Sequence, residues 1–199
     1  MNVRDHMPAA LTGLRGSAKL HLTGPAERLM AERRERQRRR AAQRELIVES
    51  GFAAALLAVA IVLPWMFDAP APSAAVVVAL IVAFGLVYRV EFDVGAGYVA
   101  PLQLVFVPAL FLVAPAWAPL VVVAGLVLGR LPDIARDGNP RRQLLVAIGN
   151  SWFAVGPAVV LAAGGVDGLA WQHWPLYVLA LGAQFAGDTA TGVAREWLV

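Results

Sequence analysis

Six apolar runs follow one another between residues 46 and 194, and they restrict the fold more than any other feature of the sequence. A helix that crosses roughly 30 Å of hydrocarbon needs about 20 residues, because each residue advances the helix by about 1.5 Å. The first, fifth and sixth runs reach that length, the second is marginal, and the third and fourth are short. The six runs cover approximately residues 46–66, 73–88, 98–113, 117–130, 144–163 and 175–194.

The composition of the chain fits a membrane protein better than a water-soluble domain. Apolar residues make up 59% of the 199 residues and charged residues only 16%, which is too apolar for a soluble domain of this length. The absence of cysteine excludes disulfides, a thiolate nucleophile and zinc sites of the cysteine type. We therefore predict an all-α polytopic membrane bundle of about six transmembrane helices.

Four prolines interrupt the tract formed by the third and fourth runs. Proline lacks a backbone N–H and clashes with the preceding helical turn, so this tract cannot form one straight helix. Residues 114–119 have the composition of a chain reversal. Two interpretations stay open: two short, proline-broken spans, or a re-entrant hairpin that leaves four full spans. The prolines are Pro101, Pro108, Pro115 and Pro119.

The N-terminal part of the chain is basic and precedes the first span. We expect a disordered tail over residues 1–25, a polybasic cytoplasmic helix over 26–45 and the transmembrane domain over 46–199. Arginines beside an anionic leaflet each contribute about 1 kcal/mol of attraction, so the lipid bilayer is the expected partner. Nucleic acid is not expected, because residues 1–45 contain no aromatic side chain. The arginines assigned to lipid headgroups are Arg33, Arg34, Arg36, Arg38, Arg39 and Arg40.

The distribution of Lys and Arg predicts the orientation. Positive residues in short loops stay on the cytoplasmic side of a bacterial membrane. With the N-terminus inside, every Lys and Arg falls on the cytoplasmic side, and loops 67–72, 114–116 and 164–174 contain none. We therefore predict a multi-pass membrane protein with both termini in the cytoplasm. Glu49, one turn into the first run, is expected to extend toward the membrane interface.

The segment 89–103 combines charge with irregular backbone. Glu91 and Asp93 alternate with apolar residues, two glycines follow, and Gln103 then enters the third run. Non-helical backbone at membrane depth is tolerated where it lines a cavity or is buried in protein. One interpretation is a polar ligand or ion site; the other is a plain cytoplasmic turn in which Arg89 pairs with one of the carboxylates.

Polar residues share one face of the sixth run. An ionisable group within a span costs a few kcal/mol unless it is paired or faces a cavity, so Asp188 should face the bundle interior. Asn150 and Ser151 of the fifth run are its expected partners. Interhelical hydrogen bonding and a ligand or signalling role are both open interpretations. The residues on this face are Gln184, Asp188, Thr191 and Arg195, at helical spacings of 4, 3 and 4.

Gly125 and Gly129 form a small-residue pair of the GxxxG type. Such a pair allows close helix approach, either within the bundle or between protomers of a homo-oligomer. No metal triad, Ser-His-Asp set or phosphate loop can be assembled from the sequence. We therefore expect no catalysis and no cofactor in this chain.

Three stretches resemble a multi-spanning N-terminal region of bacterial cyclic-di-GMP signalling proteins, the HD-GYP-type phosphodiesterases and GGDEF-type diguanylate cyclases. They are VEFDVGAGYVAPLQLVFVPALFL with VAGLVLGRLPD (within 89–133), GNSWFAVGPAVVLA (149–162) and QFAGDTATGVAREWL (184–198). The resemblance implies the membrane input part of such a protein, located in the bacterial cytoplasmic (inner) membrane, and no catalytic residue. The chain contains no HD or GGDEF module, so it is expected to be either a fragment or a stand-alone membrane unit.

Two classes of function remain. The first is a membrane-embedded sensory or anchoring module that detects a lipid, a hydrophobic small molecule, a quinone or membrane tension and signals through the sixth run. The second is a small transporter, or the substrate-binding subunit of one, which the proline-broken runs and the polar segment 89–103 favour. A third possibility is a scaffold that only assembles through its GxxxG faces.

Overall fold

The computed structural model describes residues 25–198 except 91, 95–96, 100 and 137–139. Residues 1–24 of the expected tail lie outside this part of the chain. The chain divides into two units, Met1–Arg44 and Glu45–Val199. In the first unit, Arg36 and Glu32 form an exposed ion pair one helical turn apart, 3.5 Å between nitrogen and oxygen, of a kind that contributes little stability.

Helices build almost all of the described chain, which confirms the helical class. The α-helices are α2 (Pro25–Met66), α3 (Ala74–Val87), α4 (Gln103–Leu112), α5 (Ala118–Arg136), α6 (Pro140–Gly149), α7 (Val155–Ala163) and α8 (Trp174–Leu198). Three short 3₁₀ helices adjoin them: η1 (Pro115–Trp117), η2 (Asn150–Ala154) and η3 (Trp171–His173).

Three of the described helical segments have the length and apolarity of a membrane span: Glu32–Met66, Pro115–Arg136 and Pro140–Ala163. Helices α3 and α4 contain 14 and 10 residues, or about 21 and 15 Å at 1.5 Å per residue. Helix α8 has 25 residues, but its polar positions lower its apolarity. The chain is thus compatible with a membrane protein, and the count of six spans stays a prediction.

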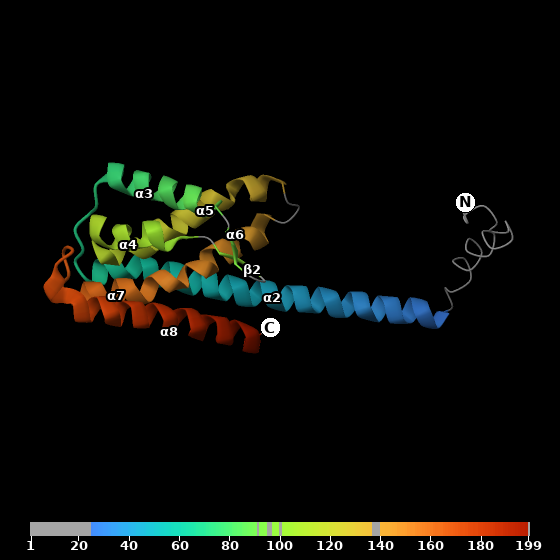
Figure 1. The fold of residues 1–199 in the computed structure, drawn as a ribbon. Helices are drawn as coiled ribbons and strands as arrows, with labels where there is room; N and C mark the ends of the chain where they lie inside the picture. Colours follow the sequence, from blue (N-terminus) through green and yellow to red (C-terminus); the bar gives the residue numbers. More distant parts are fainter. Residues whose placement is uncertain (1–24, 91, 95–96, 100, 137–139, 199) are drawn as a thin grey trace, which may run out of the picture. The chain divides into compact units, whose positions relative to one another are not determined.

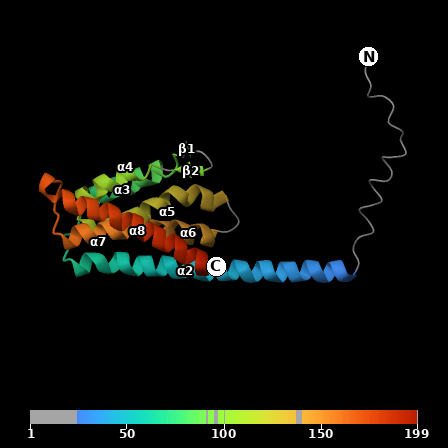
Figure 2. The same ribbon diagram turned by 60° about the horizontal axis from the view of Figure 1, so that its bottom comes forward.

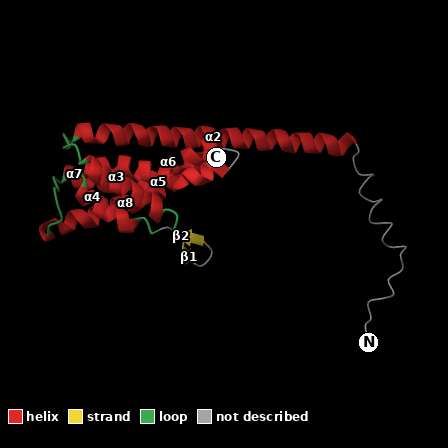
Figure 3. Ribbon diagram, turned by 90° about the horizontal axis from the view of Figure 1, so that it is seen from above, coloured by secondary structure: helices red, strands yellow, loops and turns green. Residues whose placement is uncertain are grey.

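A short hairpin separates α3 from α4. Strands β1 (Phe92–Val94) and β2 (Gly97–Val99) pair antiparallel, with Asp93 opposite Tyr98. The all-α prediction did not include this hairpin, drawn in yellow in Figure 3. The alternation of apolar and acidic residues before the two glycines suits a strand pair.

Small residues bring the helices of the second unit close together. A methyl group on Gly125 would overlap the Phe84 side chain, and one on Gly129 would lie 2.9 Å from the Tyr88 ring. The GxxxG pair therefore packs α5 against α3 within the chain, and Figure 1 shows these helices side by side. Gly156 likewise brings α7 against α8 at Ala183. In Figure 2, α6 and α7 lie between residues 45–66 of α2 and the pair α3 and α4.

The helix ends gather at two opposite ends of the second unit. One, here named the loop end, contains residues 67–73, 113–117 and 164–173. The other, the arginine end, contains strands β1 and β2, residues 130–136 and 140–142, and the last turn of α8. All six arginines of residues 45–199 belong to segments at or near the arginine end, and the loop end contains no Lys or Arg.

Candidate ligand site along α8

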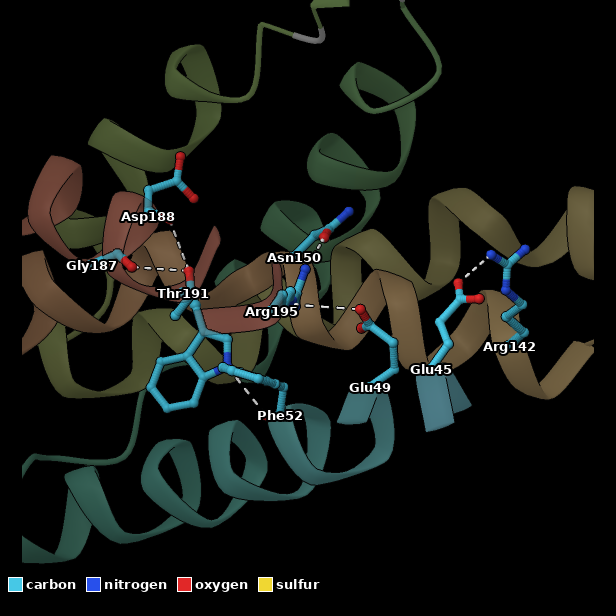
Figure 4. Close-up of polar contacts among 10 residues, drawn as sticks. Glu45, Glu49, Phe52, Arg142, Asn150, Gly187, Asp188, Thr191 and Arg195 are labelled. Carbon is cyan, nitrogen blue, oxygen red and sulfur yellow. Dashed lines mark hydrogen bonds and ion pairs between the residues drawn. The ribbon is translucent and has the colours of Figure 1, made fainter. Parts of the chain in front are cut away.

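Arg195, in the last turn of α8, joins three elements at the arginine end. Its Nε lies 3.7 Å from Oε1 of Glu49 on α2, and its Nη1 donates a hydrogen bond of 3.1 Å to Oδ1 of Asn150 in η2. Its Cζ lies 5.3 Å from the centre of the Phe52 ring, a distance typical of a cation–π contact. Figure 4 shows the guanidinium between these partners.

The Glu49–Arg195 ion pair is largely buried, so the Glu49 carboxylate faces α8 inside the second unit. Its expected position at the membrane interface stays a prediction. The side chains of Glu49 and Arg195 are 13% and 22% exposed. A buried carboxylate needs a partner that offsets the loss of hydration, and α8 supplies one from a distant part of the sequence. Gly149 permits the contact, because a methyl group there would overlap the guanidinium.

The cluster leaves polar atoms without partners. Within the described residues, Oε2 of Glu49 and the Nε and Nη2 atoms of Arg195 are buried and make no hydrogen bond. A buried donor that lacks an acceptor lowers stability by about 1–3 kcal/mol, more if it is charged. The Arg195 atoms lie against Glu49 and Gly149, inside the cluster.

A polar cavity of about 300 Å³ opens beside Arg195. It lies among the end of α3, α5, η2 and α8, and Asp188 and Thr191 line it together with Arg195. The Thr191 hydroxyl is within 2.9 Å of the Gly187 carbonyl oxygen and 3.0 Å of that of Asp188. The cavity also contacts Tyr88, Leu102, Leu126, Gly149, Asn150, Phe153 and Gly192.

The prediction that Asn150 and Ser151 are partners of Asp188 is wrong. Asn150 accepts its hydrogen bond from Arg195, and the fully buried Ser151 donates to the Ala147 carbonyl oxygen at 3.2 Å. Asp188 lines the polar cavity but is exposed. Within the described chain, its carboxylate takes part in no recorded hydrogen bond or ion pair.

A second, apolar cavity of about 230 Å³ lies among α4, α7 and α8. The predicted site residues Gln103 and Gln184 both line it, together with Phe106, Leu110 and other apolar side chains. Gln184 and Asp188 are one turn apart on α8, so the apolar and polar cavities follow each other along that helix. The four-residue face of α8 thus contributes to both.

Two of the predicted site residues cannot be placed from their side chains. Glu91 lies outside the described residues, and Asp93 is described only as a backbone position in β1. The interpretation of residues 89–103 as a ligand site, and the alternative of a turn closed by Arg89, both stay predictions.

The structure adds residues that the sequence analysis did not select. Arg130 donates from Nε to the Tyr88 hydroxyl at 2.6 Å, and Tyr88 lines the polar cavity. Trp152 donates from Nε1 to the Phe52 carbonyl oxygen at 3.2 Å, which ties η2 to α2. The sequence signal for Arg130 was a charge at the end of an apolar run; nothing in the sequence singled out Tyr88.

No cluster of three metal-ligating side chains occurs within the part of the chain that the structure describes. Comparison with protein-family models, with curated proteins and with solved structures finds no match for the chain.

Proposed function

We propose that the chain is a multi-pass protein of the bacterial cytoplasmic membrane with both termini in the cytoplasm. Large apolar side chains on several helices face outward, such as Ile61, Leu104 and Phe185 at 54%, 72% and 65% exposure. A water-soluble monomer rarely exposes contiguous apolar surface on this scale. The arginine end would face the cytoplasm, because short loops rich in Arg stay on that side.

Within this membrane setting, the proposed function is that of a sensory or anchoring module without catalysis. The observation that carries the proposal is that one helix, α8, lines both cavities and then pairs through Arg195 with Glu49 of α2. A ligand that occupies either cavity would bias the position of α8, and the ion pair would pass that bias to α2. The resemblance to membrane input regions of cyclic-di-GMP signalling proteins points to the same class.

A distance measurement between α2 and α8 tests the sensory role. The chain contains no cysteine, so cysteines introduced at the exposed positions Ser50 and Glu196 would be the only sites for spin labels. We expect the label distance to change when phosphatidylglycerol nanodiscs are supplemented with bacterial polar lipid extract or with a metabolite extract. An unchanged distance with both extracts would contradict a sensory role.

A transporter is the second candidate, favoured by the short, proline-containing α4 that lines the apolar cavity. It predicts that proteoliposomes accumulate a solute from a metabolite extract and that Gln103→Ala abolishes the uptake while the protein still inserts. Asp93→Asn is the corresponding test of the hairpin. Label movement without uptake favours the sensory module, and uptake that Gln103→Ala abolishes favours the transporter.

A further inference from the structure

We propose that the polar cavity binds a zwitterionic phospholipid headgroup, with its phosphate at Arg195 and its ammonium at Asp188. This ligand rests on the membrane location and orientation proposed above, and it names what the sensory site would recognise. The corresponding lipid is one with a phosphoethanolamine headgroup, whose acyl chain would follow α8 into the apolar cavity.

The charged residues that line the polar cavity favour a zwitterionic ligand. Arg195, which also pairs with Glu49, and Asp188 both line the polar cavity. The Asp188 carboxylate forms no hydrogen bond or ion pair within the described chain. A purely anionic ligand would meet the Asp188 carboxylate, and a purely cationic ligand would meet the guanidinium. A ligand that carries both charges satisfies both, since like charges repel and opposite charges attract over the same few ångströms.

The spacing of the two charged residues fits a headgroup that lies along the helix. Asp188 and Arg195 are seven residues apart and therefore share one face, with about 10 Å of rise between their Cα atoms. The guanidinium of Arg195 lies beside Asn150 and Glu49, and both Arg195 and Asp188 border the same cavity. Asn150 and Thr191 line the same cavity.

The depth of the site fits a headgroup. Glu49, the partner of Arg195, precedes Met66 at the end of α2 by 17 residues, or about 25 Å. The hydrocarbon core is roughly 30 Å thick. If one of its boundaries lies at the loop end, the other lies near this ion pair. A phosphate at Arg195 would lie at the level where headgroups of the cytoplasmic leaflet begin.

The apolar cavity lies where the acyl chain of a bound lipid would extend. It begins at Gln184, one turn from Asp188, and continues past Leu181 to Tyr177 and Leu169, toward the loop end. A lipid of the cytoplasmic leaflet extends its chain in this same direction, from headgroup to bilayer centre. Exposed apolar residues on α4 and α8, including Leu104 and Phe185, surround the route by which a lipid would enter from the bilayer.

Lipid retention by the full chain tests the proposal. Protein in phosphatidylglycerol nanodiscs containing a small fraction of phosphatidylethanolamine is analysed by native mass spectrometry for bound lipid. We expect preferential retention of phosphatidylethanolamine. We expect Asp188→Asn to weaken this retention about tenfold or more, the usual effect of losing a charged hydrogen bond. The same variant should raise retention of phosphatidylglycerol, because the repulsion from the carboxylate is removed.

The controls separate the ligand from the fold and from the proposed function. Glu196→Gln alters an exposed acid on the same helix and should not change the lipid preference. Free phosphoethanolamine should compete only weakly, because it lacks the acyl chain. Competition as strong as that of the lipid, equal retention of both lipids by the unmodified chain, or a preference that survives Asp188→Asn would overturn the proposal.

The α2–α8 label distance keeps the two proposals distinguishable. If phosphatidylethanolamine is retained but the distance does not change with any extract, the headgroup site is supported and the sensory role fails. If an extract changes the distance while phosphatidylethanolamine is not retained, the sensory role is supported and the headgroup site fails.

Discussion

Gly149 is the residue on which the Arg195 cluster depends most directly. A methyl group there would overlap the guanidinium and lie 3.2 Å from Oε2 of Glu49. We expect Gly149→Ala to lower the free energy of unfolding in detergent by about 1–3 kcal/mol, the usual effect of overpacking. Gly182→Ala is the control, because a methyl group there meets no atom within 4 Å. Equal stability of the two variants would contradict the geometry around Arg195.

Two glutamates four residues apart on α2 provide a matched comparison. Glu49 pairs with Arg195 in a largely buried site, whereas Glu45 pairs with Arg142 in an exposed one. We expect Glu49→Gln to destabilise by about 1–3 kcal/mol because it leaves a buried charge unpaired, and Glu45→Gln by less than about 1 kcal/mol. Chemical denaturation of both variants, at low and high salt, measures the difference. A larger loss of unfolding free energy for Glu45→Gln than for Glu49→Gln would contradict the buried position of the Glu49–Arg195 pair.

For individual residues, helical spacing in the sequence predicted which side chains share a helix face. It did not predict which residues on other helices they contact. The spacing of 4, 3 and 4 put Gln184, Asp188 and Arg195 on one side of α8, where the structure finds them lining cavities. The partner of Arg195 is Glu49, at the other end of the unit's sequence. Only the packing of α2 against η2 and α8 brings them together, and no local pattern encodes it.

Among the elements, the glycine pair of α5 has its partner inside the chain. Gly125 faces Phe84 and Gly129 faces Tyr88 of the α3 segment, so this face is occupied and is not free for a second copy. We expect Gly125→Ala to lower stability by about 1–3 kcal/mol and to leave the oligomeric state unchanged. Unfolding and light scattering in detergent measure both, with Gly187→Ala, which meets no atom within 4 Å, as the control. A changed oligomeric state would contradict an intrachain role.

The positions where proline or glycine interrupts a helix were predictable from the sequence. The strand pairing and the residue at which α4 begins were not. Proline chemistry located the reversal between α4 and α5, where η1 begins at Pro115. Gly95 and Gly97 in the sequence marked the interruption after α3, but not the pairing of β1 with β2. Helix α4 begins only at Gln103 because the hairpin uses the preceding residues, which apolarity alone does not reveal.

At the scale of the whole molecule, the open question from the sequence is whether the α4–α5 reversal crosses the bilayer or re-enters it. Helix α4 covers only about 15 Å, half of the hydrocarbon thickness. However, Trp117 of η1 lines a cavity at the loop end. The same cavity is lined by Trp65, near the end of α2, and by Asp68 and Ala69, which follow α2. The reversal therefore lies at the loop end, beside the residues that follow α2, and its passage through the bilayer stays a prediction.

This geometry predicts how an impermeant thiol reagent labels single cysteines in intact cells. A cysteine at Ala114, beside the reversal, should react from outside, as should one at Leu169, which is 76% exposed at the loop end. A cysteine at Arg136, in the last turn of α5, should react only after the membrane is opened. The cysteine-free chain makes each signal unambiguous. If the cysteine at Ala114 stays unreactive while that at Leu169 reacts, the reversal is re-entrant and the six-span arrangement is wrong.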